Sequence, residues 1–412
     1  MGYFAYIKGE LCCESLPVNE IARDVGTPFY LYTRNGLLDN FAALSARLGN
    51  LDALVCYALK ANSNETLISL LAQRGAGADV VSGGELYLAL KSGFPPERIV
   101  YAGVGKTDEE IRYALEEKIW SFNVECLEEL HAINEIAGQS GATARIGIRI
   151  NPDVDIKGHP YIATGNAENK FGIEVAKARE AIASINTFAH VKLAGFHTHI
   201  GSQIRDARPY LTSIELLKEL KHDVASLVTE LEYVDIGGGF GIDYDNALAT
   251  DETPAGTLLA DIVPSLEDFG CKIIVEPGRS LIATAGILVT KVLYRKETRG
   301  KRFLVVDAGM NDLLRPSLYE AHHEIIPVHE KNTQTMTADV VGPICESGDF
   351  LGKDRQLPEM ARGELLAVLT AGAYGFSLSS NYNARPRPAE VLVDSGAYEI
   401  IRPRGTFENL WK

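Results

Sequence analysis

The chain has 412 residues, of which 46% are apolar and 23% are charged, and its formal net charge is −15. This length favours two domains, and the composition is typical of a soluble globular protein. The negative charge argues against a nucleic-acid partner and against binding to an anionic membrane, because both attract basic surfaces. No apolar stretch is long enough to span a bilayer, and the N-terminus does not resemble a secretory signal.

Short apolar segments alternate with segments of helical periodicity from residue 53 to residue 276. Several helical segments open with a capping residue, such as Asn64 or Asp108. Eight strands that alternate with helices favour an α/β fold of the TIM-like (β/α)8 barrel type, although a doubly wound open sheet has a similar pattern. The predicted strands are 53–59, 78–82, 98–102, 119–123, 145–150, 192–199, 231–236 and 272–276.

Polar residues at the predicted strand ends favour the barrel over the open sheet. In a (β/α)8 barrel the active site lies at the carboxyl ends of the strands, so such residues would meet at one mouth. They are Lys60, Asp79, Ser82, Asn123, Arg149, Asn151, His197, His199, Gly237–Gly239, Glu276 and Arg279.

The pattern becomes rich in β-forming residues, with Gly and Pro turns, after Arg279. We therefore expect the barrel at residues 28–281 and a second, all-β domain formed by residues 1–27 and 282–412. The loop 151–172, which includes His159 and Lys170, is long and polar for a connection in a barrel, and this predicts a lid over the active face.

The six cysteines are scattered, and no two of them form a CxxC pair. This spacing predicts neither a zinc site nor a disulfide framework. Free thiols in a reducing compartment are the simplest explanation, so we expect a cytoplasmic protein.

The segment LVCYALKAN, residues 54–62, has the pattern of a buried strand but ends in Lys60. Most lysines on strands lie at the surface with the ammonium group in water. The alternative is that the strand carries Lys60 into a partly desolvated pocket, where its amine attacks a carbonyl group.

The segment VDIGGGFG, residues 234–241, places a glycine-rich turn after a predicted strand. It is not a dinucleotide-binding fingerprint, because position 242 is Ile where Gly or Ala is required. Loops after the seventh and eighth strands of a barrel often bind phosphate, so the turn could be a phosphate cradle. A simple tight turn is the alternative.

Two further segments bear groups suited to a planar cofactor. In GFHTHIGSQ, His199 could lie flat against a ring and Ser202 could bind phosphate, whereas His197 has the pattern of an ordinary core histidine. In VEPGRS, Glu276 could accept a pyridinium N–H and Arg279 could bind an anionic group, although a surface ion pair would look the same. A lysine nucleophile, a phosphate cradle, a ring contact and this carboxylate together describe a pyridoxal phosphate site.

The motifs YALKAN, HTHIGSQ, GGGFG, EPGR, CESGD and AGAYGFSLSSNYN stand in this order over nearly the whole chain. They resemble the pyridoxal-phosphate decarboxylases of the alanine-racemase-like fold. The resemblance implies that Lys60 forms a Schiff base with the cofactor, that His199 stacks on its ring and that Glu276 binds the pyridine nitrogen. The cofactor contacts that it implies are Lys60, Asp79, His199, Ser202, Gly238, Gly239, Glu276, Gly278, Arg279 and Tyr374.

The resemblance also implies a homodimer with shared active sites. Cys345 in CESGD would donate a proton, and Glu346 would bind a distal ammonium group, each in the site of the neighbouring subunit. The substrate contacts that it implies are Arg279, Arg315, Tyr319, Glu346 and Tyr374.

Several substrates fit this family. We expect meso-2,6-diaminopimelate, which would yield L-lysine and CO2 as the final step of lysine biosynthesis, because Arg315 and Glu346 suit a distal carboxylate and a distal ammonium. Ornithine, arginine and carboxynorspermidine are alternatives, but an arginine in the pocket would repel the distal amine of ornithine. A racemase would resemble enzymes with an arginine in the place of Glu276, and a non-enzymatic binding protein would be expected to lack Lys60 or Cys345.

Overall fold

The computed structural model describes residues 2–154, 169–225, 227, 231–245, 248 and 254–410. The chain divides into two compact units. The barrel unit comprises Phe41–Ile242 and Thr253–Gly278, and the β unit comprises Met1–Asn40, Asp243–Glu252 and Arg279–Lys412. Residues 28–40 thus belong to the β unit and not to the expected barrel, because strand β4 (Phe29–Thr33) pairs with two strands of the β unit.

The barrel unit contains eight parallel strands in a closed ring, which confirms the predicted fold class. The strands pair in the order β9-β11-β12-β13-β5-β6-β7-β8, and the pairing of β8 with β9 closes the ring. A short strand, β10 (Ile173–Glu174), pairs in parallel with the carboxyl end of β9. The eight strands are β5 (Ala53–Ala58), β6 (Gly77–Val80), β7 (Ile99–Tyr101), β8 (Ser121–Val124), β9 (Ala144–Asn151), β11 (Val191–His197), β12 (Tyr233–Asp235) and β13 (Lys272–Val275).

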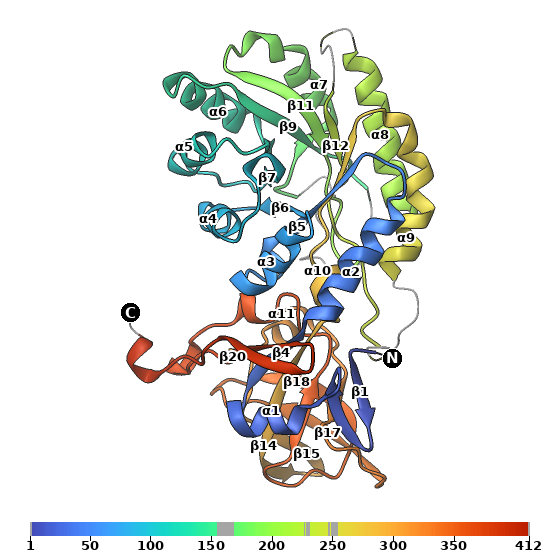
Figure 1. Cartoon of the computed structure of the whole chain (residues 1–412), viewed down its shortest axis with the longest axis vertical. Coiled ribbons are helices and arrows are strands. Elements are labelled where there is room, and N and C mark those ends of the chain that lie inside the picture. Colours follow the sequence, from blue (N-terminus) through green and yellow to red (C-terminus); the bar gives the residue numbers. More distant parts are fainter. Residues whose placement is uncertain are drawn as a thin grey trace. The chain divides into compact units, whose positions relative to one another are not determined.

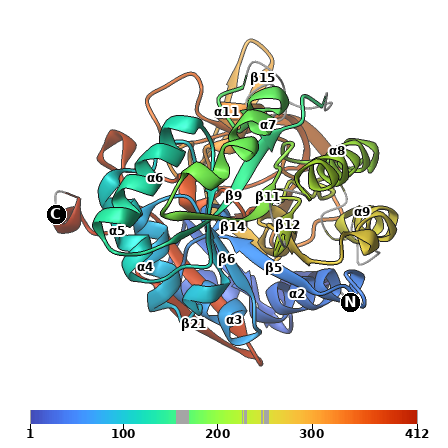
Figure 2. The ribbon, with the colours of Figure 1, turned by 90° about the horizontal axis from the view of Figure 1, so that it is seen from above.

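Helices surround these strands, as Figure 2 shows from above. Asn64 caps the first of them by accepting a hydrogen bond from the Thr66 amide, as expected. The cap of α5 is Thr107 and not Asp108, because Thr107 and Glu110 form a reciprocal capping box. The helices are α3 (Glu65–Gln73), α4 (Gly83–Lys91), α5 (Asp108–Glu116), α6 (Leu127–Gln139), α7 (Val175–Ala183), α8 (Arg208–Val224) and α9 (Pro254–Ile262), and α2 (Arg34–Arg47) precedes them.

Side chains fill the inside of the barrel. Because successive residues of a strand face opposite sides of a sheet, every second residue points inward. Leu54, Cys56, Val100, Tyr233 and Ile274 form a buried cluster there.

Tyr233 is the largest member of this interior cluster, and its hydroxyl donates a hydrogen bond to the Ser121 hydroxyl at 2.8 Å. Two glycines make room for its side chain. A Cβ atom at Gly147 would lie 2.3 Å from the Tyr233 hydroxyl oxygen, and one at Gly195 would lie 2.4 Å from the ring.

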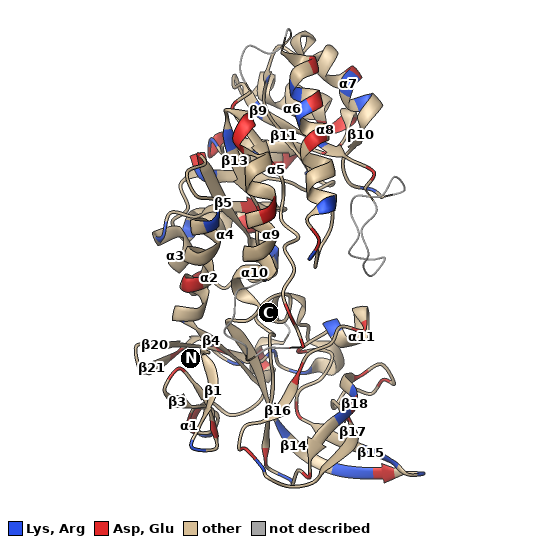
Figure 3. Cartoon of the chain, turned by 90° about the vertical axis from the view of Figure 1, so that its right-hand side faces the viewer, with Lys and Arg blue, Asp and Glu red and all other residues tan. Residues whose placement is uncertain are grey.

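Charged residues mark the outer helices of the barrel unit, where red and blue segments lie close together on α6, α7 and α8 (Figure 3). The strands inside are mostly uncharged along their length (Figure 3). The burial of the few charged groups in the interior therefore needs a specific physical explanation.

The β unit combines both ends of the chain, so that blue N-terminal strands lie with orange and red C-terminal strands (Figure 1). One sheet has the order β1-β2-β3, and the other has the path β18-β17-β15-β14-β4-β20-β21, with β19 paired to β14 and β16. Their bounds are β1 (Phe4–Ile7), β2 (Glu10–Cys13), β3 (Leu16–Pro17), β14 (Gly286–Thr298), β15 (Lys301–Val306), β16 (Ile325–Pro327), β17 (Thr335–Val341), β18 (Phe350–Pro358), β19 (Leu365–Val368), β20 (Ala389–Asp394) and β21 (Ala397–Arg402).

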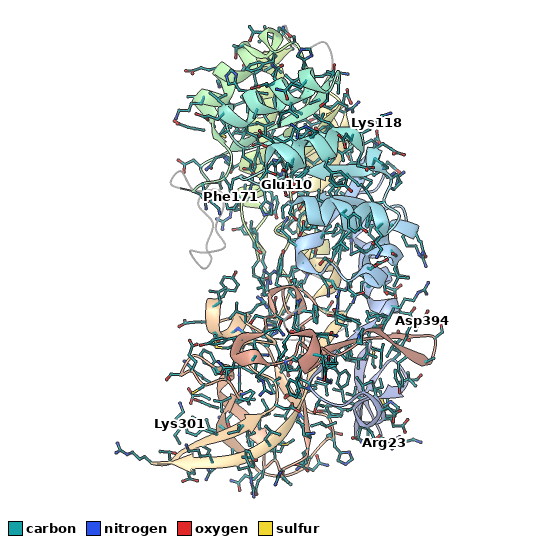
Figure 4. All side chains as sticks on the ribbon, turned by 90° about the vertical axis from the view of Figure 1, so that its left-hand side faces the viewer. Arg23, Glu110, Lys118, Phe171, Lys301 and Asp394 are labelled. Carbon is teal, nitrogen blue, oxygen red and sulfur yellow. The ribbon has the colours of Figure 1, made fainter. Side chains whose placement is uncertain are left out.

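This unit is mostly β but also contains short helices, namely α1 (Val18–Val25), α10 (Arg279–Ile282) and α11 (Arg315–Tyr319). Its core packs apolar residues of α1 and β2 against β4, β14 and β20. Lys301, labelled in Figure 4, opens β15 at the exposed end of its hairpin with β14. Among the described residues, no helix has the length and apolar character that crossing a membrane requires.

We expect Gly195→Ala to lower the free energy of unfolding by about 1–3 kcal/mol, because the added methyl group would overlap the fixed Tyr233 ring. Urea denaturation would measure the change. Gly105→Ala is a matched control, since a Cβ atom there meets no atom within 4 Å. Equal stability of the two variants would show that the barrel interior has free volume beside Tyr233.

Candidate active site

Lys60 lies just beyond the end of β5, in a 3-10 turn at Leu59–Ala61. Its ammonium group forms an ion pair with the carboxylate of Asp79, which is completely buried at the end of β6. Asp79 is the register partner of Ala58, so both face the barrel interior. Burial, followed by the negative charge of Glu276, raises the pKa of Asp79, and the charge of Lys60 opposes this shift.

Glu276 follows β13 and is buried, with 4% of its surface exposed. Its Oε2 atom lies 3.3 Å from Nε2 of His197. Burial acts to raise the pKa of Glu276, but His197 and then the charge of Lys60 hold it far below its usual value. The side chain is therefore a buried carboxylate. Its Oε1 atom is also buried and makes no hydrogen bond within the described parts of the chain.

His197 was expected to be an ordinary core histidine, and the structure corrects this in part. The ring is buried, but its Nε2 atom faces Glu276, and its Nδ1 atom has no hydrogen-bond partner among the described residues. The position of Glu276 two residues beyond Ile274 explains the contact, because both side chains then point into the barrel.

Asp235 was not predicted as a site residue. It ends β12, it is completely buried, and its Oδ1 atom accepts a hydrogen bond from the Gly237 amide at 2.9 Å. Burial and the nearby Glu276 raise the pKa of Asp235 well above its usual value. His197, Asp235 and Glu276 each place one atom within 4.8 Å of the others, a spacing that could also suit a metal. A metal would require the deprotonated Asp235 carboxylate, which the raised pKa of this group opposes.

The glycine turn after β12 brings main-chain amides beside His199. The Gly238 amide donates a hydrogen bond to Nδ1 of His199 at 3.0 Å, so the ring proton must be on Nε2. Burial, followed by the charge of Arg149, lowers the pKa of His199 well below its usual value, and the ring is neutral. A Cβ atom at Gly238 would lie 2.0 Å from the Glu276 carbonyl oxygen, and one at Gly239 would lie 2.2 Å from the Gly201 carbonyl oxygen.

Two other predicted cofactor contacts lie near this turn. Ser202 follows Gly201, against which Gly239 packs. Gly278 follows Pro277, whose carbonyl oxygen accepts a hydrogen bond from the Ala58 amide at 3.2 Å, two residues before Lys60. We call Lys60, Asp79, His199, Gly238, Gly239 and Glu276 the cofactor cluster, all of which belong to the barrel unit.

The cofactor cluster has groups that fit pyridoxal phosphate. The Glu276 Oε1 atom is a buried acceptor in need of a donor, which a pyridinium N–H would supply. The amides of Gly237 and Gly238 already donate to Asp235 and His199, so a phosphate would have to use other amides of this turn. Lys60 offers the amine for a carbonyl group, and the neutral ring of His199 suits stacking.

A buried ion pair anchors the loop that follows β9. Nη1 of Arg149 lies 2.5 Å from Oε1 of Glu125, whose Oε2 atom accepts a hydrogen bond from the Gly172 amide at 2.9 Å. The Arg149 guanidinium also lies 4.8 Å from the centre of the ring of Phe171, which Figure 4 labels. The sequence predicted Arg149 at a strand end but did not single out Glu125. Residues 155–168 of the predicted lid, including His159, lie outside the described residues.

A second group, which we call the arginine cluster, lies in the β unit and consists of Tyr244, Arg279, Arg315, His323 and Tyr374. Nη1 of Arg279 donates a hydrogen bond to the Tyr244 hydroxyl at 2.6 Å, and its guanidinium lies 5.0 Å from the centre of the Tyr374 ring. The Arg315 guanidinium lies 4.9 Å from the centre of the Tyr244 ring. The structure thus brings together three of the predicted substrate residues.

Of the remaining predicted residues, Tyr319 lies on the same short helix as Arg315, and Cys345 and Glu346 lie elsewhere in the β unit. Tyr319 ends helix α11, which begins at Arg315, and is partly buried. Cys345 and Glu346 are exposed in a turn between β17 and β18.

The Cys345–Glu346 turn has a defined structure. The Asp349 carboxylate accepts hydrogen bonds from the amides of Met310 and Ile344, both at 2.6 Å. The Cys345 amide donates to Oδ1 of Asn383 at 2.9 Å, and the Tyr382 hydroxyl donates to Glu346 at 2.9 Å. The Gly348 carbonyl oxygen also accepts a hydrogen bond from the Ser317 hydroxyl at 2.6 Å, which ties the turn to helix α11.

Comparison with known proteins identifies close relatives. The family described as "Pyridoxal-dependent decarboxylase, pyridoxal binding domain" matches residues 36–283. Diaminopimelate decarboxylase of Aquifex aeolicus is 51% identical over 98% of the chain and 96% of the relative, and that of Vibrio cholerae is 42% identical over 100% and 98%. A crystal structure of diaminopimelate decarboxylase from Helicobacter pylori in complex with L-lysine is 42% identical, covers 95% of the chain and 98% of its own, and has a TM-score of 0.90.

The partly buried side chain of Glu85, on helix α4, should make the stability of the protein depend on pH. Burial raises the pKa of Glu85 to about 7, while Lys60 and the Val81 amide oppose this shift. The folded state binds a proton here that the unfolded state has released, so this group makes stability fall as the pH rises from about 4.5 to 7. In Glu85→Gln this part of the pH dependence, about 1–2 kcal/mol, should be lost.

Urea denaturation of wild type and Glu85→Gln at pH 5 and pH 8, both without cofactor, would measure the difference. Glu117→Gln is a control, because Glu117 is exposed after helix α5. Parallel pH curves for wild type and Glu85→Gln would show that Glu85 is ionised in the folded protein at both pH values.

Proposed function

The chain belongs to the family of pyridoxal-dependent decarboxylases, and we propose that it converts meso-2,6-diaminopimelate into L-lysine and CO2. The observation that carries this proposal is Arg315, a guanidinium with 6% of its surface exposed and no carboxylate in ion-pair contact among the described residues. A buried cation without a counter-charge is costly, and the carboxylate of a bound substrate would supply that charge. The relatives named as diaminopimelate decarboxylases support this choice of substrate.

The cofactor cluster would bind pyridoxal phosphate, with Lys60 as the residue that holds its aldehyde carbon. When bound, this cofactor supplies an electron sink for the electron pair that remains as a carboxylate leaves as CO2. Glu276, kept ionised by its neighbours, would keep a proton on the ring nitrogen. Asp79 holds the Lys60 ammonium group by its ion pair, and the neutral His199 imidazole supplies a flat surface fixed by the Gly238 amide.

The arginine cluster would bind the substrate through its carboxylates. Guanidinium groups bind carboxylates bidentately, and two of them suit a substrate with two carboxylates. Tyr319 and Tyr374 would add hydroxyl contacts, and Tyr374 would also reach the cofactor phosphate. The same positive charge disfavours ornithine, arginine and carboxynorspermidine. The distal end of each of these molecules is a cation, whereas the distal end of diaminopimelate is a second amino-acid group with its own carboxylate.

We also propose a homodimer in which the Cys345–Glu346 turn completes the site of the partner subunit. The support is that Cys345 and Glu346 are exposed and that hydrogen bonds hold the turn in a defined structure. Cys345 would donate a proton to the α-carbon, and Glu346 would bind the distal ammonium. The six cysteines are free thiols, which supports a cytoplasmic location.

Release of CO2 should be much faster from meso-diaminopimelate than from ornithine, arginine or carboxynorspermidine when pyridoxal phosphate is present. Arg315→Met should lower kcat/KM for diaminopimelate by about 30-fold or more, because a buried charge contact with the substrate is lost. Arg295→Met, which removes an exposed arginine paired with Glu359, should leave kcat/KM unchanged. Preference for a diamine precursor, or an unchanged kcat/KM in Arg315→Met, would contradict the assigned substrate.

A mixture of Lys60→Ala and Cys345→Ala subunits should recover activity that neither variant has alone. In a shared site, one of the two sites of a mixed dimer contains both an intact Lys60 and an intact Cys345, so random pairing of equal amounts should give about a quarter of wild-type activity. Subunit exchange is verified first by mass spectrometry of tagged chains. Exchange without recovery of CO2 release would contradict the shared site.

A further inference from the structure

The arginine cluster raises a physical problem of its own. Arg279 and Arg315 are both buried, with 7% and 6% of their surfaces exposed, and both contact the same tyrosine. Burial, together with the charge of Arg279, lowers the pKa of Arg315, so the two cations disfavour each other. Something other than a carboxylate must hold the Arg315 guanidinium, and two neutral residues, His323 and Tyr244, are in position to do so.

His323 is completely buried in the segment after α11. Its Nδ1 atom lies 2.9 Å from the carbonyl oxygen of Leu369, which only accepts hydrogen bonds, so Nδ1 carries the ring proton. Its Nε2 atom then has a lone pair, and Nη1 of Arg315 lies 2.8 Å from it. The Leu369 carbonyl therefore fixes the tautomer that accepts a hydrogen bond from Arg315.

The charged groups around His323 favour this neutral ring. Burial, followed by the charge of Arg315, lowers the pKa of His323 well below its usual value, and Arg279 and His322 act in the same direction. A protonated ring would present a second N–H group to the guanidinium and lose the bond. His323 thus holds Arg315 without neutralising it.

Tyr244 contacts both arginines with different parts of its side chain. Its hydroxyl oxygen accepts the hydrogen bond from Arg279 at 2.6 Å, and its ring face lies under the Arg315 guanidinium, 4.9 Å away. Its ring and the His323 ring pack nearly perpendicular to each other, at 80°, with 5.2 Å between their centres. Tyr244 therefore fixes the two guanidinium groups and the His323 ring relative to one another.

We propose that His323 and Tyr244 are positioning residues that preorganise Arg279 and Arg315 for substrate carboxylates, and that they orient Arg315 without neutralising its charge. This inference rests on the proposed function, since it takes the arginines as the substrate contacts. A carboxylate in place of His323 would also orient Arg315, but it would remove the charge that the substrate needs. A neutral acceptor orients the guanidinium and leaves its attraction for an anionic ligand intact.

The test uses the holoenzyme and two probes, pimelate and cadaverine, which are a seven-carbon dicarboxylate without amines and a diamine without carboxylates. His323→Leu should raise the KM for meso-diaminopimelate and the inhibition constant of pimelate at least tenfold, and kcat should change less than threefold. The inhibition constant of cadaverine and the visible absorbance of the bound cofactor should not change. His323→Gln, whose amide oxygen can accept from Arg315, should bring the pimelate constant back to within threefold of wild type.

Tyr244→Phe keeps the ring and removes only the hydroxyl, so it should weaken pimelate inhibition by about three- to tenfold. His329→Leu is the control, because the exposed His329 ring faces Glu10 and not Arg315, and it should behave as wild type. His323→Gln and Tyr244→Phe keep the proposal testable if thermal unfolding shows that His323→Leu does not fold.

An equal loss of pimelate and cadaverine inhibition in the His323 variants, or a fall in kcat with an unchanged KM, would overturn the positioning role. Failure of the wild-type enzyme to release CO2 from meso-diaminopimelate would instead overturn the proposed function. The two failures are distinguishable, because the second is measured on the wild-type enzyme alone.

Discussion

Strict alternation of side chains along parallel strands is the constraint on which the rest of the barrel unit depends. In a closed ring of eight strands, one face of every strand points into an interior that water does not fill. Before the carboxyl ends of the strands, this interior holds Leu54, Cys56, Val100, Tyr233 and Ile274. Two residues further along their strands, the same alternation brings Asp235 and Glu276 inward, so the polar cluster lies directly beyond the apolar one.

This position determines the electrostatics of the cofactor cluster. Several acidic groups share a small buried space, and they cannot all be ionised. Glu276 keeps its charge because His197 and Lys60 are close, and Asp235, next to that charge, has a raised pKa. The result is one well-defined carboxylate in a set of neutral or paired groups, which is the arrangement that a pyridinium N–H requires.

The arginine cluster of the β unit has the opposite character. Its cations are held by a neutral histidine, aromatic rings and a hydroxyl group, and no carboxylate pairs with Arg315 in the described parts of the chain. The two clusters therefore have complementary tasks in the proposed reaction. One keeps a cofactor in a defined protonation state, and the other retains positive charge for a substrate that has two carboxylates.

The sequence by itself determined the barrel, because eight apolar segments with helical segments between them have few other stable arrangements. It also identified the residues whose type is unusual for their place, such as Lys60 at the end of a strand and Glu276 before a Pro-Gly turn. Family motifs led to Arg315, Tyr374, Cys345 and Glu346, which local patterns alone did not reveal.

Only the tertiary structure decided which groups meet and in which protonation state. His197 had the pattern of a core histidine until Glu276, 79 residues later, was found against it. Tyr244 and His323 contact arginines that lie 35 and 8 residues away, and no local pattern predicts such contacts. The pKa of a buried group depends on every charge packed around it. Those neighbours come from strands far apart in the chain, so the pKa values of the site are set only in the folded protein.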